Sequence, residues 1–88
     1  KVGSVDEFLG LSKEESQYIE LKLSLSQALA ERRKKSKLTQ AQLAKKLKSS
    51  QSRVAKMERG DPTVSMDLLV KSLIVMGANK KSIAKAIS

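Results

Sequence analysis

Cysteine and histidine are both missing from this sequence of 88 residues. Without cysteine the chain can form neither disulfides nor thiolate metal sites. Without histidine it lacks the commonest metal ligand and the commonest general base near neutral pH. The nine acidic residues are scattered and form no visible metal cluster or nucleophile–base pair. We therefore expect neither an enzyme nor a metal or cofactor site.

Aromatic residues and long hydrophobic runs are also scarce. Phe8 and Tyr18 are the only aromatic residues, so the core must be built from Leu, Ile, Val, Ala and Met. No apolar run approaches the roughly 20 residues that span a bilayer, and the first ten residues lack the apolar stretch of a secretory signal. These features predict one small soluble domain in the cytoplasm, without contact to a membrane.

Basic residues are abundant and unevenly distributed, with a formal net charge of +9. Residues 1–20 carry two basic and five acidic side chains, whereas residues 21–88 carry sixteen basic and four acidic ones. A strongly basic body suggests a polyanionic partner, and a nucleic acid is the first candidate. The alternative is that the charge only keeps the protein soluble.

Signals for helix starts recur along the chain, and the alternation of β-branched residues expected of strands is missing. Capping boxes begin at Ser4, Ser12 and Thr39, and further N-caps are Ser50, Ser65 and Asn79. We therefore predict an all-α fold that comprises an acidic N-terminal segment, residues 1–12, and a domain over residues 13–88. The expected helices lie near 5–9, 13–36, 40–47, 51–59, 66–76 and 80–87.

The helix expected over residues 13–36 has two apolar stripes. The first should face the core and contains Tyr18, Leu21, Leu25, Ala28 and Leu29. The second must be covered by the N-terminal helix, through Phe8, Leu9 and Leu11, or by a partner protein or a second subunit. This second stripe contains Ile19, Leu23 and Ala30.

Residues 40–47 and 51–59 are two short amphipathic segments separated by a polar break. This pattern is typical of a helix-turn-helix, a motif whose second helix lies in the DNA major groove. The large apolar residues of the second segment are Val54 and Met57, and burying them turns its polar side chains outward. Such side chains suit base edges and phosphates. We predict that Gln51, Ser52, Ala55 and Lys56 read bases and that Gln40, Lys45, Arg53 and Arg59 contact the backbone; for Lys45, plain surface charge is an equal alternative.

The stretches LTQAQLAKKL, SQSRVAKMERG and SMDLLVKSLIVMG together resemble the Cro/repressor-type (XRE) helix-turn-helix family over roughly residues 19–77. The resemblance implies a five- to six-helix lambda-repressor-like DNA-binding domain that binds a double-stranded operator as a homodimer and represses transcription. It also implies that Arg33 pairs with Glu58.

The chain departs from this family pattern at several positions. Lys48 stands where the family often has Gly, Ser49 where an apolar residue is usual, and Arg32 and Lys37 replace residues that are commonly Leu and Gly. A left-handed backbone at Lys48 would cost up to about 1–2 kcal/mol. The alternative is a turn of a different shape.

The stretches SVDEFLGLSKEESQYIELKLSLSQALAERR and SQSRVAKMERGDPTVSMDLLVKSLIVMGA resemble the small XRE antitoxins that are paired with RelE-type toxins. This resemblance implies a small basic toxin as partner and repression of the chain's own operon. Residues 1–20 and the second apolar stripe are then candidate contacts for the toxin. The alternatives are a phage- or plasmid-type repressor without a toxin, or a protein-interaction module that does not bind DNA.

A dimer contact is expected in the C-terminal helix, because one recognition helix reads only a few base pairs. Ile83 and Ile87 lie four residues apart and therefore share one face of that helix. They are our candidates for the dimer interface. Closure of the monomer core by the same two residues is an equal alternative.

Overall fold

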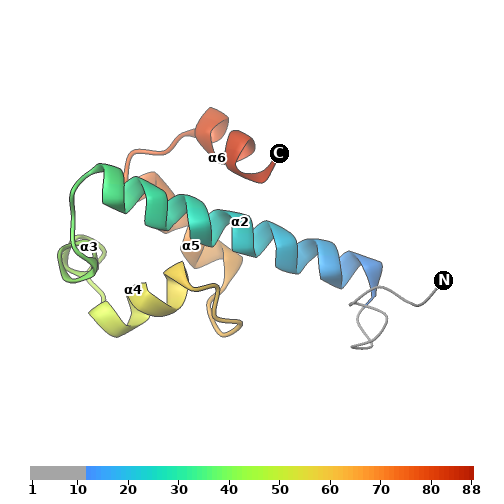
Figure 1. Cartoon of the computed structure of the whole chain (residues 1–88), viewed down its shortest axis with the longest axis horizontal. Helices are drawn as coiled ribbons and strands as arrows, with labels where there is room; N and C mark the ends of the chain where they lie inside the picture. Colours follow the sequence, from blue (N-terminus) through green and yellow to red (C-terminus); the bar gives the residue numbers. More distant parts are fainter. Residues whose placement is uncertain (1–11) are drawn as a thin grey trace.

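The computed structural model describes residues 12–88, so the helix expected near 5–9 and the capping box at Ser4 lie outside the described residues. The described part contains five α-helices and no strand (Figure 1). The all-α prediction is confirmed, and every helix boundary agrees with its predicted position within one residue. The helices are α2 Lys13–Lys35, α3 Gln40–Lys46, α4 Gln51–Glu58, α5 Met66–Val75 and α6 Lys80–Ile87.

The predicted N-caps explain where the helices begin. Ser12 and Thr39 form complete capping boxes with Glu15 and Gln42. The side chain of each remaining cap accepts a hydrogen bond from a backbone N–H in the first turn of its helix. These caps are Ser50, Ser65 and Asn79.

Helices α2 to α5 all end in the same motif, in which a residue with a left-handed backbone reverses the chain. At α3, Lys48 N–H donates to Lys45 O at 3.1 Å and Ser49 N–H donates to Ala44 O at 2.8 Å. The left-handed position is taken by glycine in α4 and α5, but by Lys37 (φ 58°) and Lys48 (φ 55°) after α2 and α3. The helix-turn-helix therefore adopts the left-handed alternative at Lys48.

Helix α2 lies between α4 and α6 and also packs along α5 (Figure 1). Leu29, Leu43, Val54 and Met57 are fully buried between these helices. The core continues through Leu25, Ala44, Val64, Leu69, Leu73 and Ala78.

The predicted core stripe of α2 is wrong at Tyr18, whose side chain is 47 % exposed. Leu21 is only partly buried, and full burial begins at Leu25. The reason is length: the first turns of α2 extend beyond the packed helices (Figure 1). Of the second stripe, Ile19 and Leu23 are exposed and Ala30 is partly buried. The predicted cover by Phe8, Leu9 and Leu11 lies outside the described residues.

Candidate nucleic-acid interface

Helices α3 and α4 pack on each other through Leu43, Ala44, Val54 and Met57. Burying these residues leaves the opposite side of α4 facing solvent. Ala55 is partly buried there. The exposed side chains on α4 and its C-cap are Gln51, Ser52, Arg53, Lys56 and Arg59.

The structure joins Arg33 of α2 to Glu58 at the end of α4. Arg33 Nε donates to Glu58 Oε2 and Nη2 donates to Oε1 at 3.0 Å, while Nη1 donates to the carbonyl of Leu38 at 2.8 Å. The two side chains of the pair are only 12 % and 8 % exposed. Such a fork-shaped, nearly buried pair fixes the angle between its two helices.

The pairing also shifts the pKa values of both side chains, Arg33 and Glu58. Burial opposes ionisation of Glu58, but the hydrogen bonds from Arg33 and Gln40 outweigh it and lower the pKa of Glu58 below its usual value. The hydrogen bond to Glu58 raises the pKa of Arg33, against the opposing effect of burial. Both groups are therefore charged at neutral pH.

Two glutamine side chains extend this ion pair to the surface of α4. Gln40 Nε2 donates to Glu58 Oε1 at 3.1 Å, and Gln51 Nε2 donates to Gln40 Oε1 at 3.4 Å. Gln51 is exposed and is the first residue of α4. The chain of hydrogen bonds thus runs from the protein interior to the N-terminus of the second motif helix.

A polar hollow of about 250 Å³ lies between α4 and the loop that follows it. Hydroxyl groups combined with cationic side chains suit a phosphate. The sequence predicts only a capping role for Ser50 and no role for Thr63. The hollow is lined by Ser50, Ser52, Arg53, Lys56, Thr63 and Val64.

Asp61 orients Thr63 at the edge of this hollow. Its Oδ1 accepts from Thr63 N–H at 2.9 Å and from Thr63 Oγ1 at 2.6 Å, and these hydrogen bonds lower the pKa of Asp61. Arg59 Nη2 lies 3.5 Å from Asp61 Oδ2. The Asp-Pro-Thr sequence, which favours a side-chain-capped turn, is the signal that could have identified this loop.

The other predicted site residues lie away from the hydrogen-bond chain. Lys45 is exposed on α3. Ile83 is partly buried against the core, whereas Ile87 is 40 % exposed. Ile83 and Ile87 line a shallow apolar hollow of about 520 Å³ together with Val70 and Ile74 of α5.

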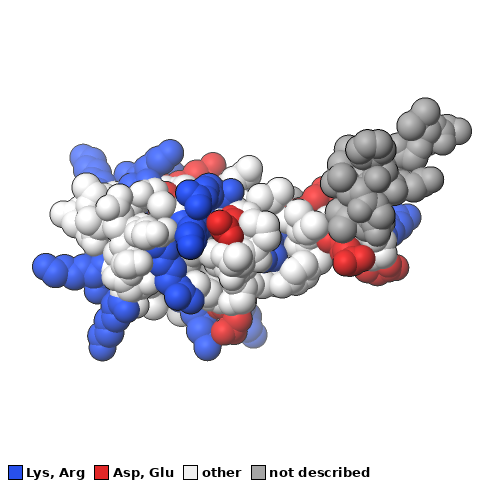
Figure 2. Space-filling view, turned by 90° about the horizontal axis from the view of Figure 1, so that it is seen from below, with Lys and Arg blue, Asp and Glu red and all other residues white. Residues whose placement is uncertain are grey.

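Charge is distributed unevenly over the molecule. Figure 2, which views Figure 1 from below and therefore from the side of α3 and α4, shows Lys and Arg side chains over the packed body. Acidic side chains gather at the end where α2 projects. The helix-turn-helix thus lies in the basic half of the molecule.

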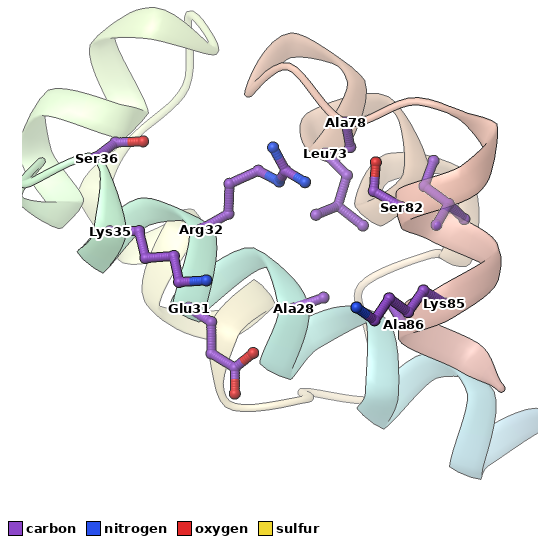
Figure 3. A pocket seen from close by; sticks show the side chains of 11 residues that line it. Ala28, Glu31, Arg32, Lys35, Ser36, Leu73, Ala78, Ser82, Lys85 and Ala86 are labelled. Atoms are coloured by element: carbon purple, nitrogen blue, oxygen red, sulfur yellow. The ribbon is translucent and has the colours of Figure 1, made fainter.

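Another hollow, of about 730 Å³, lies between α2 and α6 (Figure 3). Arg32 and Lys85 approach it from its two walls, and Leu73 and Ala78 contribute its apolar part. Helix α6, which forms one wall of this hollow, lies on the opposite side of α2 from α4 (Figure 1). The described residues, 12–88, include no cluster of acidic residues that could hold a metal ion and no helix long and apolar enough to cross a membrane.

Comparison with known families gives one match, to the helix-turn-helix family over residues 29–77. This segment runs from the buried Leu29 of α2 through α3, α4 and α5 to Gly77, and it covers more than half of the 88 residues. No curated protein and no solved structure matches the chain significantly.

Proposed function

Since the chain belongs to the XRE-type helix-turn-helix family of DNA-binding transcriptional regulators, we propose that it is a repressor that binds a palindromic operator as a homodimer. The observation that carries the proposal is the hydrogen-bond chain Arg33–Glu58–Gln40–Gln51. It holds a polar side chain in a defined position at the start of α4, within a basic surface. A helix surface that only served solubility would not need this support.

Base reading is assigned to Gln51, Ser52, Ala55 and Lys56. A glutamine amide can form two hydrogen bonds with adenine, and Gln40 already orients the amide of Gln51. Lys56 reaches guanine or phosphate, and the methyl group of Ala55 can touch a thymine methyl. Together these contacts would specify the few base pairs that one recognition helix covers.

Backbone contacts are assigned to Gln40, Lys45, Arg53 and Arg59. We add the hydroxyls of Ser50 and Thr63, because they line the polar hollow beside Arg53 and Lys56. Phosphate contacts of this kind position the protein without reading sequence. They also make binding sensitive to salt, since each neutralised phosphate releases counterions.

Dimerisation is proposed to use the apolar hollow formed by Val70, Ile74, Ile83 and Ile87. Two-fold symmetry would separate the two α4 helices by about one turn of DNA, roughly 34 Å. The 54 % exposure of Ile74 and the 40 % exposure of Ile87 leave apolar surface available for this contact.

The finer proposal is that this repressor is the antitoxin of a type II pair that regulates its own operon. It is supported by the resemblance to XRE antitoxins of RelE-type toxins and by the five acidic side chains against two basic ones in residues 1–20. A small basic toxin would be attracted to this segment. A phage- or plasmid-type repressor without a toxin remains the competing candidate, because it would share the same DNA-binding surface.

The test is binding to the DNA upstream of the protein's own gene, against a scrambled duplex, at two salt concentrations. We expect Gln51→Ala to weaken binding to the operator about tenfold or more, because one well-made base contact contributes about 1–3 kcal/mol, and to affect the scrambled duplex little. Lys45→Ala should weaken binding to both duplexes and flatten the salt dependence. Gln27→Ala, an exposed glutamine of α2, is the matched control.

Each outcome of this assay decides between two alternative roles for a residue or for the protein. An equal loss on both duplexes would make Gln51 a phosphate contact, and an unchanged salt slope would make Lys45 plain surface. Absence of DNA binding in the wild type would favour a protein-interaction module. Co-purification with a small basic protein encoded beside the gene would separate an antitoxin from a repressor that acts alone.

A further inference from the structure

The hollow between α2 and α6, here called the α2–α6 hollow, has the size of a site for a small molecule. Its volume of about 730 Å³ lies within the range of about 300–1,000 Å³ that is usual for ligand pockets. Ala28 of α2 and Ala86 of α6 line it and are too small to fill it (Figure 3). The buried residues Leu73 and Ala78 give it an apolar floor.

Three cationic side chains and one carboxylate line the described part of this hollow. Arg32 and Lys35 come from α2, and Lys85 comes from α6. The carboxylate is that of Glu31. Figure 3 shows Arg32 and Lys85 extending from opposite walls toward the space between the two helices. None of the three cations forms an ion pair within residues 12–88. The hollow therefore has an excess of positive charge that would attract an anion.

Arg32 has the least favourable environment of these cations. Its side chain is partly buried, and a buried charge is costly unless it is paired. The guanidinium reaches from α2 to the turn between α5 and α6, because a Cβ atom at Gly77 would lie 3.9 Å from Arg32 Nη1. Arg32 also stands where the family commonly has Leu, which would make this wall apolar. A guanidinium can bind a carboxylate or a phosphate through two parallel hydrogen bonds.

The shape and the polarity of the hollow together indicate the kind of anion. An inorganic ion would neutralise the cations but would leave the floor formed by Leu73 and Ala78 uncovered. An organic anion with several carbon atoms would satisfy both the cations and the floor. Operator DNA on α4 would not reach this wall, since α6 lies on the opposite side of α2 from α4 (Figure 1). A small molecule therefore fits better than a DNA phosphate.

Helix α6 connects this hollow to the proposed dimer contact. No residue of α6 is fully buried, so packing alone holds this helix weakly. Ala78 and Ile83 line both the α2–α6 hollow and the apolar hollow that contains Ile87. An anion that bridges Arg32 of α2 and Lys85 of α6 would fix α6, and with it the apolar side chains proposed for the dimer contact.

We propose that the α2–α6 hollow binds a small amphiphilic organic anion, a carboxylate or phosphate joined to an apolar chain, and that the bound anion strengthens the homodimer by fixing α6. The binding site is independent of the proposed function, whereas its effect on the dimer rests on the proposed homodimer. Because coupling is reciprocal, the dimer should bind the anion more tightly than the monomer does.

The test of the site is calorimetric titration of the full chain with octanoate and with octyl phosphate, below the concentrations at which they form micelles. The wild type should bind at least one of them at one site per chain, and Arg32→Leu should bind it at least tenfold more weakly, because it removes the two-pronged contact. Lys85→Gln removes the charge of the opposite wall and should also weaken binding. Lys34→Leu is the matched control, since Lys34 is exposed on α2 and does not line the hollow, and it should change affinity less than twofold.

Each result of the titration supports or overturns the site. Equal weakening by Arg32→Leu and Lys34→Leu would mean general attraction by a basic protein, and unchanged binding in Arg32→Leu would place the anion elsewhere. Octanamide, which is uncharged, should bind at least tenfold more weakly than octanoate, and inorganic phosphate should bind more weakly than octyl phosphate. Equal binding of octanamide would overturn the role of the cations, and equal binding of inorganic phosphate would overturn that of the apolar floor.

Sedimentation with and without saturating anion tests the effect on the dimer. We expect the anion to strengthen wild-type dimerisation at least threefold and to leave that of Arg32→Leu unchanged. A wild-type chain that binds the anion and remains a monomer would overturn the proposed homodimer but not the site. A dimer that is unaffected by the bound anion would overturn the coupling alone, and a dimer that binds neither probe would overturn this proposal while the proposed function stands.

Discussion

Lys37 and Lys48 adopt the backbone conformation that Gly60 and Gly77 adopt after α4 and α5. A side chain in this region brings Cβ close to the following carbonyl oxygen, which costs about 1–2 kcal/mol. The hydrogen bonds of Lys48 and Ser49 to the last turn of α3 compensate part of this cost. The shape of the turn is thus imposed by the packing of α4 and not by the residue at the turn.

Lys48→Gly should therefore stabilise the protein by about 0.5–1 kcal/mol. This value is the strain energy that glycine removes, minus the entropy cost of glycine's greater flexibility in the unfolded chain. The measurement is the free energy of unfolding by urea. Lys45→Gly, in the last turn of α3, is the control with the same loss of charge, and it should destabilise the protein by up to about 1 kcal/mol. Equal destabilisation by both variants would show that Lys48 is not strained.

Ser26 is a second residue whose local environment is unfavourable. Its side chain is 2 % exposed on the face of α2 that meets Gly60, and within the described residues no group partners its Oγ. Burying an unpaired hydroxyl costs about 1–3 kcal/mol. A small residue is needed there because α4 ends close by, but a hydroxyl is not.

Ser26→Ala is accordingly expected to stabilise the protein by about 1 kcal/mol or more, because it removes the unpaired hydroxyl and improves helix propensity. Ser24→Ala, on the same helix but partly exposed, should give only the propensity gain of about 0.5 kcal/mol. Thermal unfolding of both variants checks the difference. No excess gain at Ser26 would mean that its hydroxyl does have a partner in solution.

At the scale of elements, α4 contributes little to the core yet must be held rigidly. Its buried residues are Val54 and Met57 alone. Additional support comes from Arg33 through Glu58, and from Ser72 Oγ, which lies 3.7 Å from Met57 Sδ. The Arg33–Glu58 pair also orients Gln40 and so connects the stability of α4 to the candidate base reader Gln51.

Glu58→Gln tests this connection through pH. The folded state lowers the pKa of Glu58, so its stabilising effect is present above the unfolded pKa, about 4.3, and is lost as the pH falls through the folded value. We expect the variant to be about 1–2 kcal/mol less stable than the wild type at pH 7. The difference should shrink as the pH falls through the lowered pKa of folded Glu58, because the wild-type carboxyl then also becomes uncharged. A difference that is independent of pH would exclude the charged pair as its cause.

At the scale of the whole molecule, two candidate surfaces are formed by different helices. The basic face carries α3 and α4, and the apolar hollow lies between α5 and α6. The proposed DNA face and the proposed dimer contact therefore do not overlap. In the proposed homodimer, operator affinity depends on dimerisation, because one recognition helix covers only a few base pairs.

Ile87→Glu should therefore yield a monomer that binds the operator at least tenfold more weakly. The fold should survive, since Ile87 is 40 % exposed and lies near the end of α6. Sedimentation gives the oligomeric state, and thermal unfolding gives the stability. Val75→Glu is the control, because Val75 has similar exposure but lies outside the hollow. An Ile87→Glu variant that remains a dimer would assign Ile87 to the monomer core instead.

The helices of this protein are determined by the sequence alone, because their caps are local: Ser12, Thr39, Ser50, Ser65 and Asn79 each bond a backbone N–H of their own helix. The helix-turn-helix was predictable for the same reason, from spacing and from the burial of Val54 and Met57. Family resemblance, and not periodicity, pointed to Arg33 and Glu58.

Only the tertiary structure decided the features that depend on where one element ends against another. Periodicity gives the face of α2 but not the length of its neighbours, so Tyr18 was assigned to the core and is exposed. Thr63 joins Ser50 and Lys56 at one hollow because the loop after α4 folds back, which no local pattern specifies. The contact of Gln40 with both Glu58 and Gln51 likewise needs α3 and α4 at a fixed distance from each other. Hydrogen bonds within one turn follow from sequence, whereas those between helices follow from packing.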